Sequence, residues 1–283
     1  MLGAIIGDIV GSRFEWANHK SKNFDLFTLD CSPTDDSVMS LAVAKALLAS
    51  KEDWSRLSEN TVKYMQEIGR DYPNCGYGGN FFYWILSDNP QPYASYGNGA
   101  AMRISAVGFV ADSIEQAKYL SQAVTQVSHN HTEGIKGAEA VAVAIFLARN
   151  GVSMDEIRDY IDENYYPMDF TLDQIRDSYT FDVTCQGSIP QAFQSFFEST
   201  SFEDAVRNAI SIGGDSDTIA AICGGLAEAY YGLSDEIRQE ALSFLDNRLL
   251  EIVVEFENES IECVIENIIR IKQNKTKKNM NSS

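Results

Sequence analysis

The chain has 283 residues, of which 45% are hydrophobic, so it can bury a sizeable core in one large domain or two small ones. Its 22 Lys and Arg residues against 41 Asp and Glu give a net charge of −19, which argues against non-specific binding to nucleic acids or to anionic membranes. The absence of an apolar run of roughly 18 residues and of a signal-peptide pattern indicates a cytoplasmic protein.

Apolar residues recur at helical spacing in several long segments. In chain order, the clearest of these predicted helices cover residues 38–48, 114–127 and 137–150, and a run of small residues at 220–232 predicts another. Small residues let helix axes approach closely, as in the centre of a bundle. No pattern alternates helices with buried strands. The sequence therefore predicts an all-α, compact, single-domain helical bundle over residues 1–271, followed by a disordered polar tail at 272–283.

Three pairs of residues have the spacing of a capping box, in which a hydroxyl caps a helix and a side chain three residues later reaches back. They are Ser113 with Gln116, Ser153 with Glu156, and Thr200 with Glu203. These pairs predict helix starts just after residues 113, 153 and 200.

Two acidic clusters stand at predicted helix starts. One contains Thr34, Asp35 and Asp36; the other contains Asp215, Asp217 and Thr218. A single N-cap explains only one polar residue in each cluster, whereas each carries a second carboxylate. With three histidines and five scattered cysteines without a CxxC pair, a metal site here would need oxygen ligands. Carboxylates and hydroxyls suit Mg²⁺ or Mn²⁺, so the clusters predict a metal-assisted hydrolase.

Five motifs, in this order along the chain, resemble those of the ADP-ribosylhydrolases of the ADP-ribosylglycohydrolase type, a family that includes the enzyme removing ADP-ribose from dinitrogenase reductase. They are GAIIGDIVGSRFEW, PTDDSVMSLAVAKALL, YGNGAAMRISAVG, SHNHTEGIKGAEA and IGGDSDTIAAICGG, and they extend from Gly3 to about Gly232. The resemblance implies an all-helical enzyme that binds two Mg²⁺ or Mn²⁺ ions and cleaves the glycosidic bond between ADP-ribose and a modified acceptor.

The resemblance also implies roles for single residues. Thr34, Asp35 and Asp36 match one group of metal ligands, and Asp215, Asp217 and Thr218 match the other; Asp35 and Asp217 are also expected to be needed for catalysis. Glu15 matches an acidic position near the metals, either a general base or a gate. Asp8 is expected to serve packing or to support the ligands.

The loop around YGNG is expected to bind the substrate. Ser95, Gly97, Asn98 and Gly99 match the segment that wraps the diphosphate and the distal ribose, because glycines let backbone amides approach phosphate. Tyr96 is expected to stack on the adenine or to line its pocket, and His129 to approach the ligand. An ordinary turn at the N-G pair is the alternative.

The resemblance implies an ADP-ribosylated protein, or another ADP-ribosylated acceptor, as partner, and free ADP-ribose as product. A monomer is expected. Arginine, serine, a nucleic-acid end and a small metabolite remain open as acceptors, because the motifs do not fix the rim of the cleft. Two other functions also remain open: a catalytically silent protein that binds ADP-ribose or a nucleotide, and a two-metal hydrolase of phosphoanhydrides.

Overall fold

The computed structural model describes residues 1–258, and these residues form helices joined by loops, with no strand among them. The predicted all-α class is confirmed. The expected tail at 272–283 and the domain boundary at 271 lie outside the described residues. The helices are α1 (Leu2–Gly11), η1 (Ser12–Phe14), α2 (Asp35–Ser50), η2 (Trp54–Arg56), α3 (Leu57–Asp71), α4 (Gly79–Leu86), α5 (Gly99–Met102), α6 (Ser105–Val110), α7 (Ile114–Thr125), α8 (Thr132–Arg149), α9 (Met154–Asn164), α10 (Leu172–Ile175), α11 (Cys185–Phe197), α12 (Phe202–Ser211), α13 (Ser216–Tyr231), α14 (Asp235–Leu242) and α15 (Asn247–Glu257).

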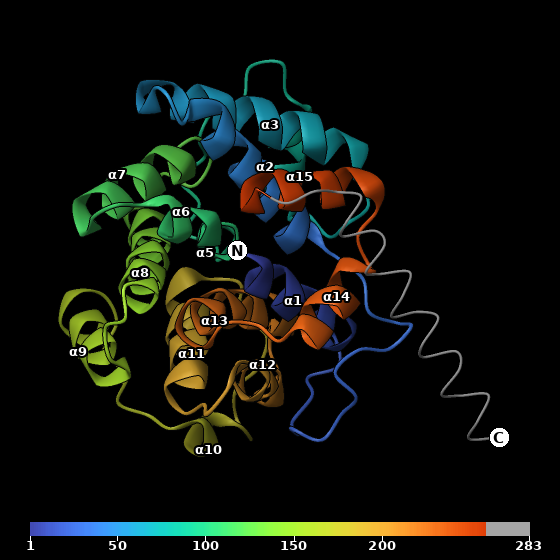
Figure 1. Cartoon of the computed structure of the whole chain (residues 1–283), viewed down its shortest axis with the longest axis vertical. Coiled ribbons are helices and arrows are strands. Elements are labelled where there is room, and N and C mark those ends of the chain that lie inside the picture. The colour runs from blue at the N-terminus through green and yellow to red at the C-terminus, as the bar shows by residue number, and fades with distance from the viewer. Residues whose placement is uncertain (259–283) are drawn as a thin grey trace.

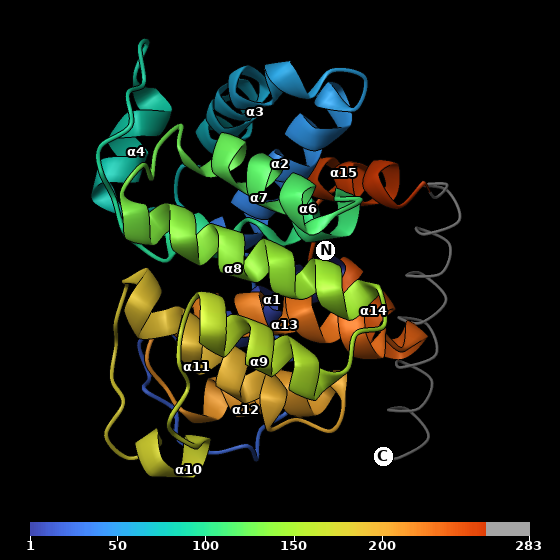
Figure 2. The ribbon, with the colours of Figure 1, turned by 90° about the vertical axis from the view of Figure 1, so that its left-hand side faces the viewer.

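The long helix α8 lies between two groups of helices. Figure 2 shows α2, α3, α6, α7 and α15 on one side of it, and α1, α9, α11, α12 and α13 on the other. Helices α1 and α13 lie near the centre of the molecule in Figure 1, and α13 packs against α1, α8, α11 and α12. Buried hydrophobic side chains from both groups form one continuous core.

Helix α13 is buried along most of its length, because its residues are small and apolar. Every residue from 216 to 227 is buried, including Asp217 and Thr218 at its start. Helix α8 has the same character, with a run of buried residues from 140 to 145. Small side chains let both helices pass through the interior, as their composition predicts.

A row of glycines brings α1 into direct backbone contact with α13. Gly3, Gly7 and Gly11 follow one another at intervals of four and therefore share one face of the helix. A Cβ atom at Gly7 would lie only 1.9 Å from the carbonyl oxygen of Ala220, and one at Gly3 only 2.3 Å from that of Gly224. This close approach places Asp8 beside the first turn of α13.

The capping boxes are confirmed in part. Ser153 and Glu156 form the complete box, whereas the side chain of Ser113 caps α7 alone, because Gln116 accepts from the amide of Asp112 instead. The box at Thr200 is wrong by one residue: Ser201 caps α12 through the amide of Asp204. A complete box at Thr171 and Gln174 was not predicted.

In the part of the chain that the structure describes, no helix combines the length and the apolar character that crossing a membrane requires. The four described cysteines, at positions 31, 75, 185 and 223, are free thiols.

Candidate active site

A cavity of about 570 Å³ gathers most of the residues that the sequence singled out. Its lining includes every predicted site residue except Thr34 and Tyr96, namely Glu15, Asp35, Asp36, Ser95, Gly97, Asn98, Gly99, His129, Asp215, Asp217 and Thr218. The two acidic clusters, 180 residues apart in the chain, therefore border one space together with the YGNG loop.

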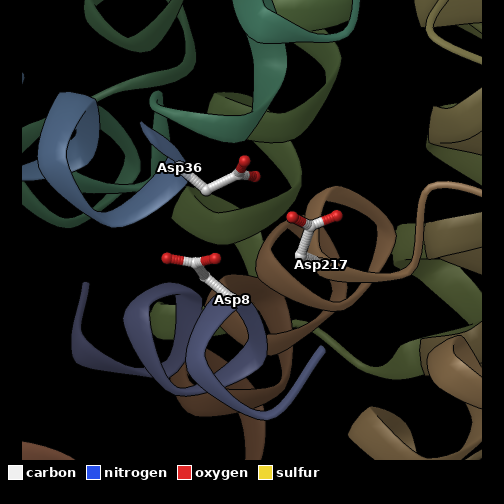
Figure 3. Close-up of side chains that lie close together, drawn as sticks. All are labelled: Asp8, Asp36 and Asp217. Atoms are coloured by element: carbon white, nitrogen blue, oxygen red, sulfur yellow. The ribbon is translucent and has the colours of Figure 1, made fainter. Parts of the chain in front are cut away.

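Two groups of carboxylates meet at one side of this cavity and share Asp217. Asp8, Asp36 and Asp217 form the first group, and Glu15, Asp215 and Asp217 form the second. Within each group the oxygen atoms lie within 4.8 Å of one another. Figure 3 shows the first group, whose side chains come from α1, α2 and α13 and converge on one region.

Two glycines position the second acidic cluster at the start of α13. Gly213 and Gly214 both have left-handed backbone angles, with φ of 69° and 75°, which favour glycine. They turn the chain so that Asp215 stands at the N-cap position and Asp217 in the first helical turn. Lys20 supports this turn, because its Nζ donates to the carbonyl oxygen of Ile212 at 2.6 Å.

Burial makes this assembly of acids unfavourable without cations. It raises the pKa of Asp36 and of Asp217 well above the ordinary value, and the charges of the neighbouring carboxylates raise both further. Burial and the charge of Asp215 also raise the pKa of Glu15 to about 7. Bound divalent cations would relieve this repulsion, since they favour the ionised carboxylates.

The residues present fit Mg²⁺ or Mn²⁺. Both groups consist of carboxylates, the ligands that hard divalent cations prefer. Asp36 is 3% exposed, its Oδ1 has no hydrogen-bond partner, and its Oδ2 accepts from the hydroxyl of Thr218 at 3.2 Å. A buried carboxylate oxygen without a partner is costly, and a cation would satisfy it.

Asp8 differs from Asp36 because protein groups already occupy most of its lone pairs. It accepts from the amide of Thr34 at 2.9 Å and its hydroxyl at 2.6 Å, from the amide of Ser37 at 3.0 Å, and from the hydroxyl of Ser37. A carboxylate offers about four acceptor sites. Asp8 therefore anchors the start of α2 and holds Asp36 in place, which is the supporting role expected from the sequence.

Two of the predicted metal ligands, Thr34 and Asp35, have different surroundings from the others. The hydroxyl of Thr34 donates to Asp8, and Thr34 is the N-cap of α2. Asp35 lines the cavity but belongs to neither group, and burial together with the charge of Asp8 raises the pKa of Asp35 to about 8. Metal binding by these two residues, as by the other four predicted ligands, stays a prediction.

Two backbone amides of the YGNG loop, which were expected to face the ligand, donate to protein oxygens instead. The amide of Gly97 donates to the hydroxyl of Ser95 at 3.2 Å, and that of Asn98 donates to the carbonyl oxygen of Val183 at 2.8 Å. The side chain of Asn98 instead links the loop to the acids, because its Nδ2 donates to Asp215 at 2.7 Å. Tyr96 lies outside the cavity lining, is 47% exposed and packs edge-on against His131.

A family model described as ADP-ribosylglycohydrolase matches residues 1–274 of the chain. The chain belongs to the ADP-ribosylglycohydrolase family. This finding confirms the resemblance that the five motifs predicted and the enzyme class that it implied.

Similar proteins include several named enzymes. The chain is 25% identical to mouse ADP-ribosylhydrolase ARH3, over 82% of this chain and 83% of ARH3. It is 27% identical to the ADP-ribosylarginine hydrolase Tri1 of Pseudomonas putida, over 83% of this chain and 70% of Tri1. It is 26% identical to the ADP-ribosyl-[dinitrogen reductase] glycohydrolase of Rhodospirillum rubrum, over 76% and 74% of the two chains.

A solved structure titled as an ADP-ribosylglycohydrolase-related protein complex shares the fold. It matches with a TM-score of 0.63 over 92% of this chain and 96% of that chain, at 20% sequence identity.

The structure of this ADP-ribosylglycohydrolase family member adds one charged residue that the sequence reasoning missed. Arg103 is fully buried at the cavity wall and forms no ion pair among the described residues. Its guanidinium lies 5.2 Å from the ring of Phe81 and contacts His129. The sequence feature that could have identified Arg103 is its position directly after the YGNGAAM segment.

An exposed aromatic pair also borders the cavity. Trp16 and Phe181 stack with ring centroids 4.8 Å apart, and both line the cavity. They are 78% and 41% exposed, which is unusual for large aromatic side chains. Trp16 follows Glu15 directly, so the pair borders the acidic side of the cavity.

Proposed function

We propose that the protein hydrolyses the glycosidic bond between ADP-ribose and a modified acceptor, releasing free ADP-ribose, and that two Mg²⁺ or Mn²⁺ ions assist the reaction. One observation carries the proposal: a single cavity is lined on one side by four of the five converging carboxylates, and on another side by the YGNG loop, His129 and Arg103. Such a cavity suits a ligand with hydroxyl groups at one end and a diphosphate further along. ADP-ribose has this chemistry.

The carboxylates at the acidic side would hold the ions. Asp36, Asp215 and Asp217, with the hydroxyl of Thr218, are the best placed ligands, and Thr34 and Asp35 complete the proposed set. Bound there, the ions would supply positive charge that orients the ribose hydroxyls and favours deprotonation of water. Asn98 fixes the orientation of Asp215, and Asp8 fixes the segment that carries Asp36.

Glu15 is the proposed general base. It is half-buried, and it lies within 4.8 Å of Asp215 and Asp217 as measured between carboxylate oxygens. Bound cations would keep this carboxylate ionised, which is the form that accepts a proton from an attacking water molecule. It directly follows the 3₁₀ turn η1, which continues α1 and packs against α13.

The acceptor would leave through the side of the cavity that Trp16 and Phe181 border. A protein carrying ADP-ribose, or another ADP-ribosylated acceptor, is the proposed partner. Arginine is the acceptor class named for the relative Tri1. We further propose that the protein is cytoplasmic and monomeric. Analytical ultracentrifugation tests the oligomeric state.

Product analysis tests the proposal. The protein is incubated with Mg²⁺ or Mn²⁺ and a panel of acceptors ADP-ribosylated on arginine, on serine, on a nucleic-acid end or on a small molecule. Chromatography with mass spectrometry then identifies the product. Free ADP-ribose is expected. AMP would instead indicate cleavage of the diphosphate, and binding of ADP-ribose without any product would indicate a silent binding protein.

Variants connect the activity to the acids. Asp217→Asn removes the charge that both carboxylate groups share, so we expect turnover to fall severely. Asp173→Asn is the matched control, because this acid lies on α10 with a side chain 87% exposed. Equal turnover in Asp217→Asn and Asp173→Asn, or full activity in excess chelator, would contradict the metal-assisted mechanism.

A further inference from the structure

His129 makes two contacts through one nitrogen of its ring. This residue lies between α7 and α8 and is only 5% exposed. Its Nδ1 lies 2.9 Å from the hydroxyl oxygen of Ser128 and 3.3 Å from Nη2 of Arg103. Nη2 of Arg103 also donates to the same hydroxyl at 2.8 Å. The three side chains therefore form a closed triangle.

The donor and acceptor roles in this triangle follow from chemistry. A guanidinium carries only donors, so a contact from Nη2 to Nδ1 requires Nδ1 to accept. The hydroxyl of Ser128 accepts from Arg103 and can direct its own proton to Nδ1. Two donors can therefore face Nδ1, and this arrangement favours the tautomer without a proton on that nitrogen. A neutral ring with an acceptor at Nδ1 carries its proton on Nε2.

The surroundings also disfavour a doubly protonated ring. In the described part of the chain neither His129 nor Arg103 forms an ion pair. The other groups that pack on the imidazole are the rings of Phe81 and Tyr93, with centroids 6.1 and 5.5 Å away. Burial and the positive charge of Arg103 lower the pKa of His129 well below its ordinary value.

The other ring nitrogen borders the substrate loop. A Cβ atom at Gly99 would lie 3.3 Å from Nε2 of His129, and one at Gly97 would lie 3.8 Å from it. Both glycines and His129 line the cavity. Because these glycines carry no side chain, the Nε2–H group stays open to a ligand at this wall.

We propose that Arg103 and Ser128 are positioning residues, which hold His129 neutral with its proton on Nε2, so that this N–H donates to a diphosphate oxygen of ADP-ribose. Arg103 is fully buried and also lines the cavity, and in this proposal it acts on the ligand through the imidazole. The identity of the ligand rests on the proposed function, whereas the position of the proton does not. His129 is thus a hydrogen-bond donor and takes no part in proton transfer.

Nuclear magnetic resonance of the free protein, labelled with ¹⁵N-histidine, tests the position of the proton. The chain has three histidines, so the spectrum of His129→Ala assigns the signal of interest. We expect a protonated Nε2 and an unprotonated Nδ1 in the wild type. Arg103→Met should give a mixture of both tautomers, and Arg103→Lys, which keeps a donor and the charge, should restore the single form. A proton on Nδ1 in the wild type, or an unchanged tautomer in Arg103→Met, would overturn the proposal.

Calorimetry with ADP-ribose tests the consequence for binding. His129→Ala removes the proposed donor, and losing one hydrogen bond to a charged group should weaken affinity roughly tenfold. Arg103→Met should weaken affinity only in proportion to the fraction of the Nε2–H tautomer that it loses, about twofold for an equal mixture. In the His129→Ala background Arg103→Met should leave the affinity unchanged, because it acts through the ring. A further loss of about threefold or more in that background would show that Arg103 acts on the ligand without His129 and would overturn the positioning role.

Ser128→Ala provides a second variant. It keeps the positive charge of Arg103 and should fold even if Arg103→Met does not. It removes one of the two donors to Nδ1, so we expect a smaller shift of the tautomer and of the affinity in the same direction. Ser105→Ala is its matched control, a buried serine whose hydroxyl has no partner. Equal spectra and affinities for Ser128→Ala and Ser105→Ala would contradict a role for Ser128. If wild-type protein binds no ADP-ribose, the proposed function fails, and the spectra still test the proton on Nε2.

Discussion

The contact between α1 and α13 offers a strong test of how the fold builds the site. In Gly7→Ala, the new methyl group would lie 1.9 Å from the carbonyl oxygen of Ala220 and 2.7 Å from the amide nitrogen of Ala221. Both are backbone atoms, so a rotamer change cannot relieve the clash. Ordinary contacts begin at 3.4 Å, and the two helices must therefore move apart by about 1.5 Å.

This separation should be costly in stability and in function. Overpacking of a core costs about 1–3 kcal/mol, and a clash with backbone belongs at or above the upper value, so we expect a loss of about 3 kcal/mol. For a domain of this size the melting temperature should fall by about 6–12 °C, as differential scanning calorimetry would measure. Asp8 follows Gly7, and Asp217 lies one turn before Ala220. The shift should therefore also weaken Mg²⁺ binding.

Gly69→Ala is the matched control, in the last turn of α3. A Cβ atom there would meet only side-chain atoms of Ile85, at 3.0 Å and beyond, and this side chain can adjust. Alanine also favours a helix over glycine by about 1 kcal/mol, so we expect a melting temperature close to that of the wild type. If Gly7→Ala melts within about 2 °C of Gly69→Ala, the close contact does not hold the two helices as described.

Four further outcomes are expected. Glu15→Gln should lower turnover by roughly 10²-fold while the melting temperature changes little, and wild-type kinetics would make Glu15 a bystander. Asp8→Asn places an amide against the donors of Thr34 and Ser37, so the free energy of unfolding in urea should fall by about 2–3 kcal/mol. An unchanged midpoint would contradict the anchoring role of Asp8. Adding Mg²⁺ at about 100 times its Kd should raise the free energy of unfolding of the wild type by about 2.7 kcal/mol but have little effect on Asp36→Asn. Equal stabilisation of the two proteins would place the ion elsewhere. Trp16→Ala should raise KM for ADP-ribosylated acceptors and leave the affinity for free ADP-ribose unchanged, and weaker binding of free ADP-ribose would place this ring against the nucleotide instead.

Several features followed from the sequence alone because they depend on local chemistry. Helical spacing and small residues predicted the all-α class, and the Ser153 box fixed a helix start, since a cap and its partner are only three residues apart. The acidic clusters at residues 34–36 and 215–218 stood out because each holds more carboxylates than a helix start needs. Family motifs then linked these clusters to a reaction, which composition and spacing could not do.

Other features depended on contacts between distant segments, which no local pattern encodes. The sequence showed that Asp36 and Asp217 are acidic, but only the packing of α1 against α13 and α2 brought their oxygens within 4.8 Å of one another and of Asp8. The amide of Asn98 seemed free for a ligand until the fold placed the carbonyl oxygen of Val183 against it. Tertiary structure decides these points because the partner of a buried polar group is set by whichever segment the core brings beside it.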